Sequence, residues 1–196
     1  MPEGVIKFTE EQLLEAGKPI DFSFNQLTSL ENLGIDGPRS TRIGSIPERS
    51  SSRRYLTRAI WLNNNKLPNI RHMEVFVNKA LAEPSRLGWI DFSFNFITGI
   101  DEEILKFPNL SVVYFHGNVI KDIDEIFKLR PLELLRSVTF HGNPISELLK
   151  YRGYVITYLP QVVNLDFSPI TELERHEPKP PDAVKKVAAA LEKKRR

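Results

Sequence analysis

The chain has 196 residues, of which 41% are hydrophobic and 27% charged, and its net charge of +2 is uneven: residues 179–196 carry +5, which leaves −3 for residues 1–178. This length suffices for one domain with a hydrophobic core, and the absence of cysteine excludes disulfides and thiolate metal sites. The N-terminus has no apolar signal segment and no apolar run is long enough to span a membrane, so we expect a cytoplasmic protein without a membrane segment.

The first predicted element is a short N-terminal helix. Thr9-Glu10-Glu11-Gln12 has the form of a capping box, and Gly17 follows as a stop signal. Stacked repeats expose apolar surface at their ends unless a cap covers it. We therefore expect residues 1–17 to form a helical cap over the first repeat.

A hexapeptide, Ile-Asp-Phe-Ser-Phe-Asn, follows at residues 20–25 and returns unchanged at residues 90–95. Both copies fit the frame apolar-x-apolar-x-x-Asn-x-apolar, which also begins at Ile60, Val113 and Val138. This is the leucine-rich repeat pattern in five copies. Alternating apolar residues predict one short strand per copy. We expect an α/β fold: a solenoid with a short concave parallel sheet, a helical or irregular convex side, and caps at both ends.

Each copy places one asparagine where the chain must turn after its strand. A buried asparagine can hydrogen-bond the backbone groups that the turn frees, which an apolar residue cannot do. The spacings between these residues are 40, 30, 23 and 25, whereas ordinary repeats take about 20–29 residues, so the first two intervals contain insertions. The predicted ladder consists of Asn25, Asn65, Asn95, Asn118 and Asn143.

The two insertions differ in character. Residues 34–54 are rich in Gly, Ser, Pro and Arg, carry a charge of +3 and show no apolar period, which predicts a flexible loop. A solvated loop is one interpretation, and a binding or phosphorylation element is the other. Residues 71–82 have the spacing of a helix that turns Met73, Phe76 and Val77 inward on the convex side.

A second cap is predicted after the fifth repeat. Residues 151–160 read as a helix and residues 162–166 as a final strand that ends in Leu-Asp. This arrangement resembles the C-terminal cap of the protein-phosphatase-regulator class of leucine-rich repeats. We assign residues 18–170 to the repeat domain, including this cap.

Residues 171–196 form a basic tail, which we expect to be helical from Asp182 because an N-cap residue precedes an alanine-rich run. A frayed, solubilising tail is one interpretation, and a basic helix that docks on an acidic partner surface is the other. In the second interpretation the contacts are Lys185, Lys186, Lys193, Lys194, Arg195 and Arg196.

Alternate strand positions point away from the core and form the concave face. Neighbouring strands lie about 4.8 Å apart, so Trp61, Trp89 and Tyr114 bring three rings to one solvent-facing surface that includes both tryptophans of the chain. Such a group indicates a protein interface; the alternative is that a flanking loop covers it. The predicted partner-binding residues of this face are Trp61, Asn63, Trp89, Asp91, Tyr114, His116, Thr139 and His141.

Catalytic chemistry has little support in this arrangement. His116 and His141 occupy equivalent places in adjacent repeats, but the side chains beside them are poor metal ligands and both lie in His-Gly-Asn turns. No Ser/His/Asp arrangement, phosphate-binding loop or paired carboxylates is visible. We expect no enzyme activity, no metal and no cofactor. Nucleic acid is disfavoured, because the charged members of the face are Asp21 and Asp91.

Several blocks resemble a family of small leucine-rich repeat proteins more closely than the generic repeat pattern requires. The blocks are residues 60–67, 89–95, 109–118, 135–144 and 151–155, and the resemblance spans roughly residues 19–170.

This resemblance implies a non-enzymatic repeat protein in a family that tracks with motile cilia. We therefore expect a subunit of a larger assembly, an adaptor in the ciliary axoneme or another microtubule-associated structure. A helix or extended peptide would bind the concave face, and an acidic surface such as tubulin would bind the tail. The alternatives are a regulatory subunit of a soluble enzyme such as a protein phosphatase and, less favoured, a nucleic-acid-associated adaptor.

Overall fold

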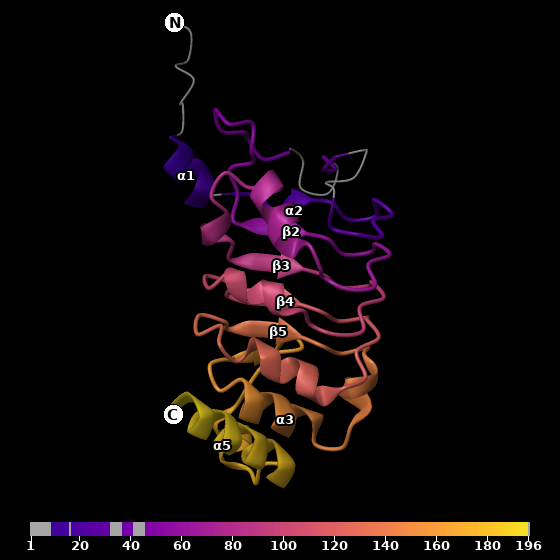
Figure 1. Cartoon of the computed structure of the whole chain (residues 1–196), viewed down its shortest axis with the longest axis vertical. Coiled ribbons are helices and arrows are strands. Elements are labelled where there is room, and N and C mark those ends of the chain that lie inside the picture. The colour runs from indigo at the N-terminus through magenta and orange to yellow at the C-terminus, as the bar shows by residue number, and fades with distance from the viewer. Residues whose placement is uncertain (1–8, 16, 32–36, 41–45, 196) are drawn as a thin grey trace, which may run out of the picture.

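The computed structural model describes residues 9–15, 17–31, 37–40 and 46–195, with side chains up to residue 193. In this part of the chain one sheet of seven strands runs along the molecule in the order β1 to β7 (Figure 1). Strands β1 to β6 pair in parallel, and β7 turns back antiparallel to β6. The predicted α/β leucine-rich repeat solenoid is confirmed. The strands are β1 (Ile20–Asp21), β2 (Ala59–Trp61), β3 (Trp89–Asp91), β4 (Val112–Tyr114), β5 (Ser137–Thr139), β6 (Asn164–Leu165) and β7 (Ser168–Pro169).

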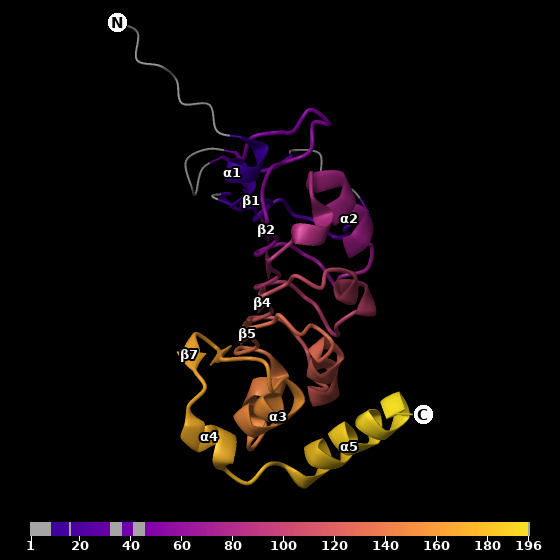
Figure 2. The ribbon, with the colours of Figure 1, turned by 90° about the vertical axis from the view of Figure 1, so that its left-hand side faces the viewer.

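Helical segments cover the side opposite the concave face, as the edge-on view in Figure 2 shows. The second insertion forms α2 (Met73–Ala80), which buries Met73, Phe76 and Val77. The later repeats use short 3-10 helices, two of which start at an aspartate that accepts a backbone N–H: Asp101 from Glu103 and Asp122 from Asp124. These helices are η1 (Pro84–Arg86), η2 (Glu102–Lys106), η3 (Ile123–Leu129) and η4 (Pro144–Glu147).

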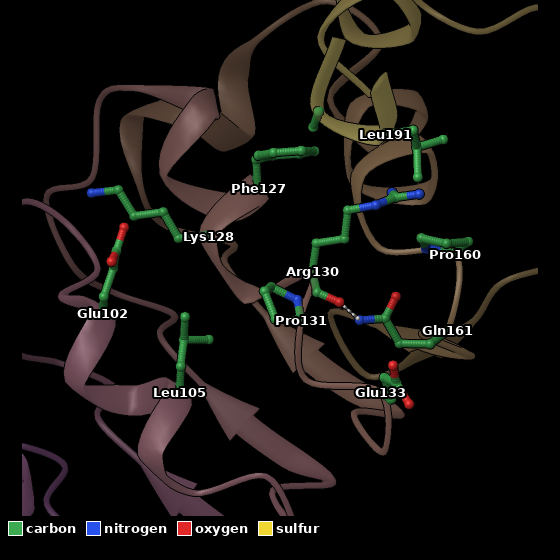
Figure 3. Close-up of a pocket in the computed structure, with 11 residues that line it drawn as sticks. Glu102, Leu105, Phe127, Lys128, Arg130, Pro131, Glu133, Pro160, Gln161 and Leu191 are labelled. Atoms are coloured by element: carbon green, nitrogen blue, oxygen red, sulfur yellow. Dashed lines mark hydrogen bonds between the residues drawn. The ribbon is translucent and has the colours of Figure 1, made fainter. Parts of the chain in front are cut away.

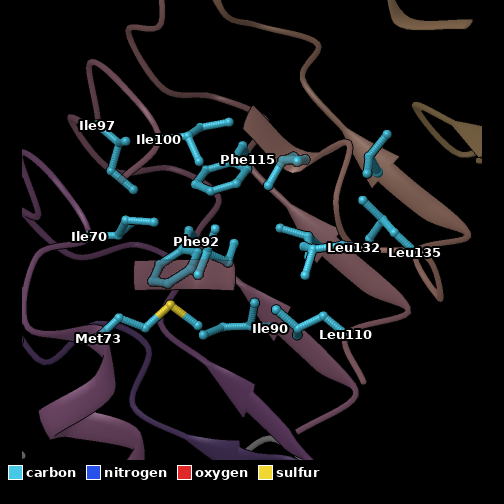
Figure 4. Close-up of a cluster of buried hydrophobic side chains, with 14 of the residues drawn as sticks. Ile70, Met73, Ile90, Phe92, Ile97, Ile100, Leu110, Phe115, Leu132 and Leu135 are labelled. Carbon is cyan, nitrogen blue, oxygen red and sulfur yellow. The ribbon is translucent and has the colours of Figure 1, made fainter. Parts of the chain in front are cut away.

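The core lies between the sheet and these helices. Phe92, Phe115 and Phe140 stack from one repeat to the next, with centroid distances of 5.4 and 6.0 Å. Figure 4 shows this core around Phe92 and Phe115, with Met73 of α2 reaching toward Ile90. Each repeat therefore buries its apolar residues only against its neighbours, as expected of a solenoid.

The asparagines join consecutive repeats through the same set of hydrogen bonds. The Asn95 amide donates to the carbonyls of Leu62 and Phe92, both at 3.0 Å, and accepts from the backbone N–H of Leu67 at 3.0 Å. Equivalent bonds occur at Asn65, Asn118 and Asn143.

Asn25 differs from the other members of the ladder because its strand, β1, is the first of the sheet in the described part of the chain. It is half-buried and donates to the carbonyl of Gly37, in the first insertion, at 2.6 Å. The insertion therefore takes the place that a preceding repeat occupies elsewhere.

The N-terminal end is closed by two segments. Helix α1 (Glu10–Glu15) begins at a capping box in which Thr9 and Gln12 exchange side-chain-to-backbone bonds of 2.9 and 3.2 Å. The described part of the insertion makes specific contacts. Arg39 forms an antiparallel bridge to Asp21, and Arg49 forms one to Tyr55, which directly follows the insertion, is buried and also bridges to Leu81. Residues 34–36 and 41–45 of the predicted flexible loop lie outside the described residues.

Three helices close the C-terminal end: α3 (Tyr151–Tyr158), α4 (Glu172–His176) and α5 (Pro181–Arg195). Helix α5 is docked at its start, since Ala183 is fully buried and the Tyr154 hydroxyl donates to Asp182 at 2.7 Å. Further along the helix, Ala190 and Leu191 line a pocket together with Leu105 and Phe127 of the solenoid. Among the described residues no helix is long and apolar enough to cross a membrane.

Candidate functional site

An unbroken series of aromatic rings runs across the concave face. The Trp61 and Trp89 centroids are 5.6 Å apart, those of Trp89 and Tyr114 6.0 Å, and those of Tyr114 and Phe167 5.2 Å, with interplanar angles of 72° in every pair. This edge-to-face geometry is the preferred one for aromatic pairs. Trp61, Trp89 and Tyr114 are all half-buried, so they fix one another while part of each ring still reaches solvent.

A carboxylate lies among these rings. Strand register sets Asp91 level with Trp61 on one side and Tyr114 on the other, and Trp89 is two residues earlier on the same face of the same strand. Burial raises the pKa of the Tyr114 hydroxyl, and the nearby negative charge of Asp91 adds to that increase. The centre of the face therefore combines a negative charge with aromatic walls.

The repeated aspartate of the hexapeptide has a structural role. Asp21 accepts the backbone N–H of Ser23, and Asp91 accepts that of Ser93, each at 2.8 Å. These bonds bend the chain away from the strand, as an Asx-turn does. Each bond occupies one carboxylate oxygen of its aspartate.

The residue before each ladder asparagine adopts a left-handed conformation. Gly117 and Gly142 have φ of 67° and 70°, whereas Phe24 and Phe94 hold φ of 59° and 53° in the same position. A bulky residue at positive φ is strained. In this turn the Phe94 ring is 54% exposed and lies beside His116, with the centroids 5.1 Å apart.

The two histidines of the face stack on each other, with centroids 4.6 Å apart and planes 9° from parallel. His116 shares a hydrogen bond of 2.8 Å with Thr139, and His141 lies 3.2 Å from Asp166. Burial, assisted by His141, lowers the pKa of His116 to about 4, so its ring is neutral at pH 7. No group of three or more potential metal ligands occurs among the described residues.

The predicted partner-binding residues fall into two sets. Asn63, His116 and Thr139 are almost fully buried, whereas His141 is exposed and Trp61, Trp89, Asp91 and Tyr114 are half-buried. The second set is the one that a partner could touch directly, and its binding role stays a prediction.

Two exposed aromatic residues of this region were not predicted. Phe94 occupies the frame position that glycine fills in later repeats, a sequence signal that could have identified it as an unusual turn residue. Phe167 is 62% exposed and follows the last parallel strand, and it contacts Tyr114 and both histidines. No repeat position corresponds to it, so the sequence gives no such signal.

The predicted basic tail is only partly available to a partner. Lys185 and Lys193 are exposed. Lys186, in contrast, lies 2.6 Å from Asp124 and 5.3 Å from the ring centroid of Phe127, so it binds the protein's own domain. The side chains of Lys194 and Arg195, and all of Arg196, lie outside the described residues.

A separate pocket of about 570 Å³ lies on the convex side beneath α5 (Figure 3). Its walls include Leu105, Phe127 and Leu191, and its rim carries Arg130, whose carbonyl accepts from the Gln161 amide at 3.1 Å. The pocket is largely apolar and contains none of the predicted partner-binding residues.

Comparison with known proteins identifies similar chains. A family model described as leucine-rich repeat matches residues 68–193. The mouse protein named leucine-rich repeat-containing protein 51 is 43% identical over 158 residues, which cover 80% of this chain and 81% of the mouse protein; the human protein of the same name is 42% identical over the same length and shares. A chain in the crystal structure of the Drosophila melanogaster SNF/U2A' complex has the same fold, with a TM-score of 0.58 and 20% identity over 95% of this chain and 99% of that one.

Proposed function

The chain belongs to the leucine-rich repeat family, with relatives named leucine-rich repeat-containing protein 51, and on that premise we propose that it is a non-catalytic adaptor that binds a protein partner through its concave face. The aromatic series from Trp61 to Phe167 carries the proposal. Tryptophan and tyrosine are enriched among the residues that dominate protein interfaces. Here they are held by each other with part of every ring open to solvent.

The size of the face restricts the ligand. A stable interface takes about 800 Å² on each partner, and the strands here are only two or three residues long. The ligand is therefore a short helix or an extended peptide, or a larger partner that also contacts the rims at Phe94 and Phe167.

The test is quantitative affinity capture with the Trp61→Ala/Trp89→Ala variant. A matched control, Val75→Ala/Leu149→Ala, removes two exposed apolar side chains outside the concave face. We expect the tryptophan variant to lose the partner that the wild-type chain and the control both retain, while circular dichroism shows the same fold in all three. Equal capture by the tryptophan variant would remove the proposal.

The finer part of the proposal places the adaptor in a cytoskeletal assembly, the ciliary axoneme in particular. Its support is the family resemblance and the basic tail, since Lys185 and Lys193 are exposed and microtubule surfaces are acidic. Microtubule co-sedimentation tests it: Lys185→Glu/Lys193→Glu should weaken pelleting, whereas Lys66→Glu/Lys121→Glu, which changes exposed lysines of the solenoid, should not. Equal pelleting by both variants would exclude the tail as a microtubule contact.

The C-terminal cap supports a second candidate, a regulatory subunit of a soluble enzyme such as a protein phosphatase. This candidate predicts that the same partner is captured from cells that lack cilia. Capture restricted to ciliated cells would favour the cytoskeletal adaptor.

A further inference from the structure

We propose that strands β1 to β3 of the concave face bind an extended peptide carrying a basic side chain. The peptide backbone would accept from the indole N–H groups of Trp61 and Trp89 and donate to the side-chain oxygens of β1 and β2. The inference rests on the proposed function, because it names the class of partner that the same face takes.

The observation that carries it is a cluster of buried polar side-chain atoms without hydrogen-bond partners. Among the described residues these atoms number five, and all five lie on the concave face of β1 to β3 or just beyond the strand ends. Buried polar atoms of folded proteins are nearly always paired, so their gathering on one surface indicates a polar ligand site. The atoms of this polar patch are Asp21 Oδ2, Ser23 Oγ, Trp61 Nε1, Asn63 Oδ1 and Trp89 Nε1.

The polar patch is continuous. Asp21 is level with Trp61 in the β1–β2 register, and Ser23 and Asn63 lie two residues further along the same face. The Trp89 ring contacts the Trp61 ring edge to face. Asp21, Ser23 and Asn63 are 1%, 0% and 6% exposed, so each is more than nine-tenths buried and has a polar atom left over.

The mixture of donors and acceptors selects a peptide backbone. The two indole nitrogens only donate, the Asp21 and Asn63 oxygens accept, and the Ser23 hydroxyl can do either. An extended peptide presents N–H and C=O groups in alternation, so it can satisfy both kinds of atom at once. A ligand that only accepts or only donates could satisfy part of the patch at best.

Charge complementarity selects a basic side chain on that peptide. The outward positions of β1 to β3 contain two carboxylates, Asp21 and Asp91, and no lysine or arginine. Around Asp91 stand Trp61, Trp89 and Tyr114, whose faces attract a lysine or arginine side chain through cation–π contact. The site thus offers a cation a negative charge and aromatic walls together.

The indole N–H groups of Trp61 and Trp89 must become accessible before a ligand can bind them. Both indole rings are half-buried, while their Nε1 atoms lie out of solvent, so a change of side-chain rotamer is needed to present the N–H groups to a ligand. Binding should therefore alter the surroundings of both tryptophans, which are the only two in the chain. Intrinsic tryptophan fluorescence is a direct readout of this step.

The test selects binders to the full chain from a random dodecapeptide library displayed on phage and measures the affinities of the selected peptides by fluorescence titration. We expect lysine or arginine to be enriched at one position. Asp91→Asn keeps the turn-forming oxygen but removes the charge, and it should weaken these peptides about tenfold. Trp89→Phe keeps a ring but removes the N–H and should weaken them by several fold. Glu147→Gln, a charge change at an exposed residue of η4, should leave the affinity unchanged.

Three results would overturn the inference: no peptide selected, an acidic or apolar consensus, or basic peptides whose affinity is the same for wild type and Asp91→Asn. These failures are distinguishable from failure of the proposed function. If capture of a protein partner still depends on Trp61 and Trp89 while no basic peptide binds, the adaptor proposal stands and the peptide inference is refuted.

Discussion

Removing one interior asparagine of the ladder should destabilise the protein far more than removing the terminal one. Asn118 is 4% exposed and makes three hydrogen bonds of 2.9–3.0 Å: two donated to Phe92 and Phe115 and one accepted from Ile97. Asn118→Ala leaves two carbonyls and one N–H without that partner in the core. At about 1 kcal/mol for each lost bond, and more where a group stays unsatisfied, the free energy of unfolding should fall by about 3–5 kcal/mol.

Asn25→Ala provides the matched control. Asn25 is half-buried, and within the described part of the chain its amide donates to the carbonyl of Gly37, so we expect a loss of about 1 kcal/mol. Urea denaturation followed by circular dichroism gives both values, and for a domain of this size 3 kcal/mol corresponds to a fall in Tm of about 6–12 °C. Equal losses in the two variants, or a loss under about 1 kcal/mol for Asn118→Ala, would refute the assignment of the ladder as an interior polar seam.

Three further predictions concern the turns and the C-terminal cap. In Gly117→Ala the new Cβ would lie 2.7 Å from Phe94 Cδ1 at a residue with φ of 67°. Thermal unfolding should therefore show a loss of stability of about 1–3 kcal/mol, and adding Phe94→Ala should restore the steric part of that loss. An unchanged stability would contradict the left-handed turn. The Arg152 side chain, together with the Thr171 backbone, lowers the pKa of Glu174 from 4.5 to about 2. The stability advantage of wild type over Glu174→Gln should therefore be complete above about pH 4.5 and shrink as the pH falls toward 2, and it should stay below about 1 kcal/mol because the pair is near the surface. An advantage that is constant across denaturation curves from pH 2 to 7 would contradict this prediction. Ala183→Asp places a charge at a fully buried position of α5. The helix should then detach, so that limited proteolysis cleaves at Lys185 while the repeats stay protected. An unchanged cleavage rate would show that the contact at Ala183 does not hold α5.

The sequence was sufficient for the parts of the fold that repeat. A strand, a turn and an asparagine recur at fixed spacing in the sequence, and each repeat contacts only its neighbours. The local sequence pattern therefore predicts the tertiary contacts as well. Asn25 departs from the pattern because the insertion, rather than a neighbouring repeat, supplies its hydrogen-bond partner. The contacts of the insertion depend on Tyr55 and Arg39 and not on a periodic apolar pattern.

The candidate site was less accessible to sequence reasoning. Alternation along a strand predicts the direction of a side chain but not what covers it, so Asn63 and Thr139 face the concave side and are nevertheless buried. Lys186 belongs to a basic run, yet the docking of α5 brings it to Asp124. Phe167 joins the aromatic series only because β7 turns back beside the face.

The most direct test of the concave face as the binding surface is site-specific photo-crosslinking in an extract of ciliated tissue. A benzophenone side chain replaces Tyr114, among the aromatic rings, or Val75, which is exposed on α2 at the convex side. We predict that the side chain at position 114 forms a covalent adduct with a protein partner and that the side chain at position 75 does not. Excess wild-type chain should suppress this adduct, whereas excess Trp61→Ala/Trp89→Ala chain should not. Adducts from position 75 alone, or equal suppression by both competitors, would contradict the account.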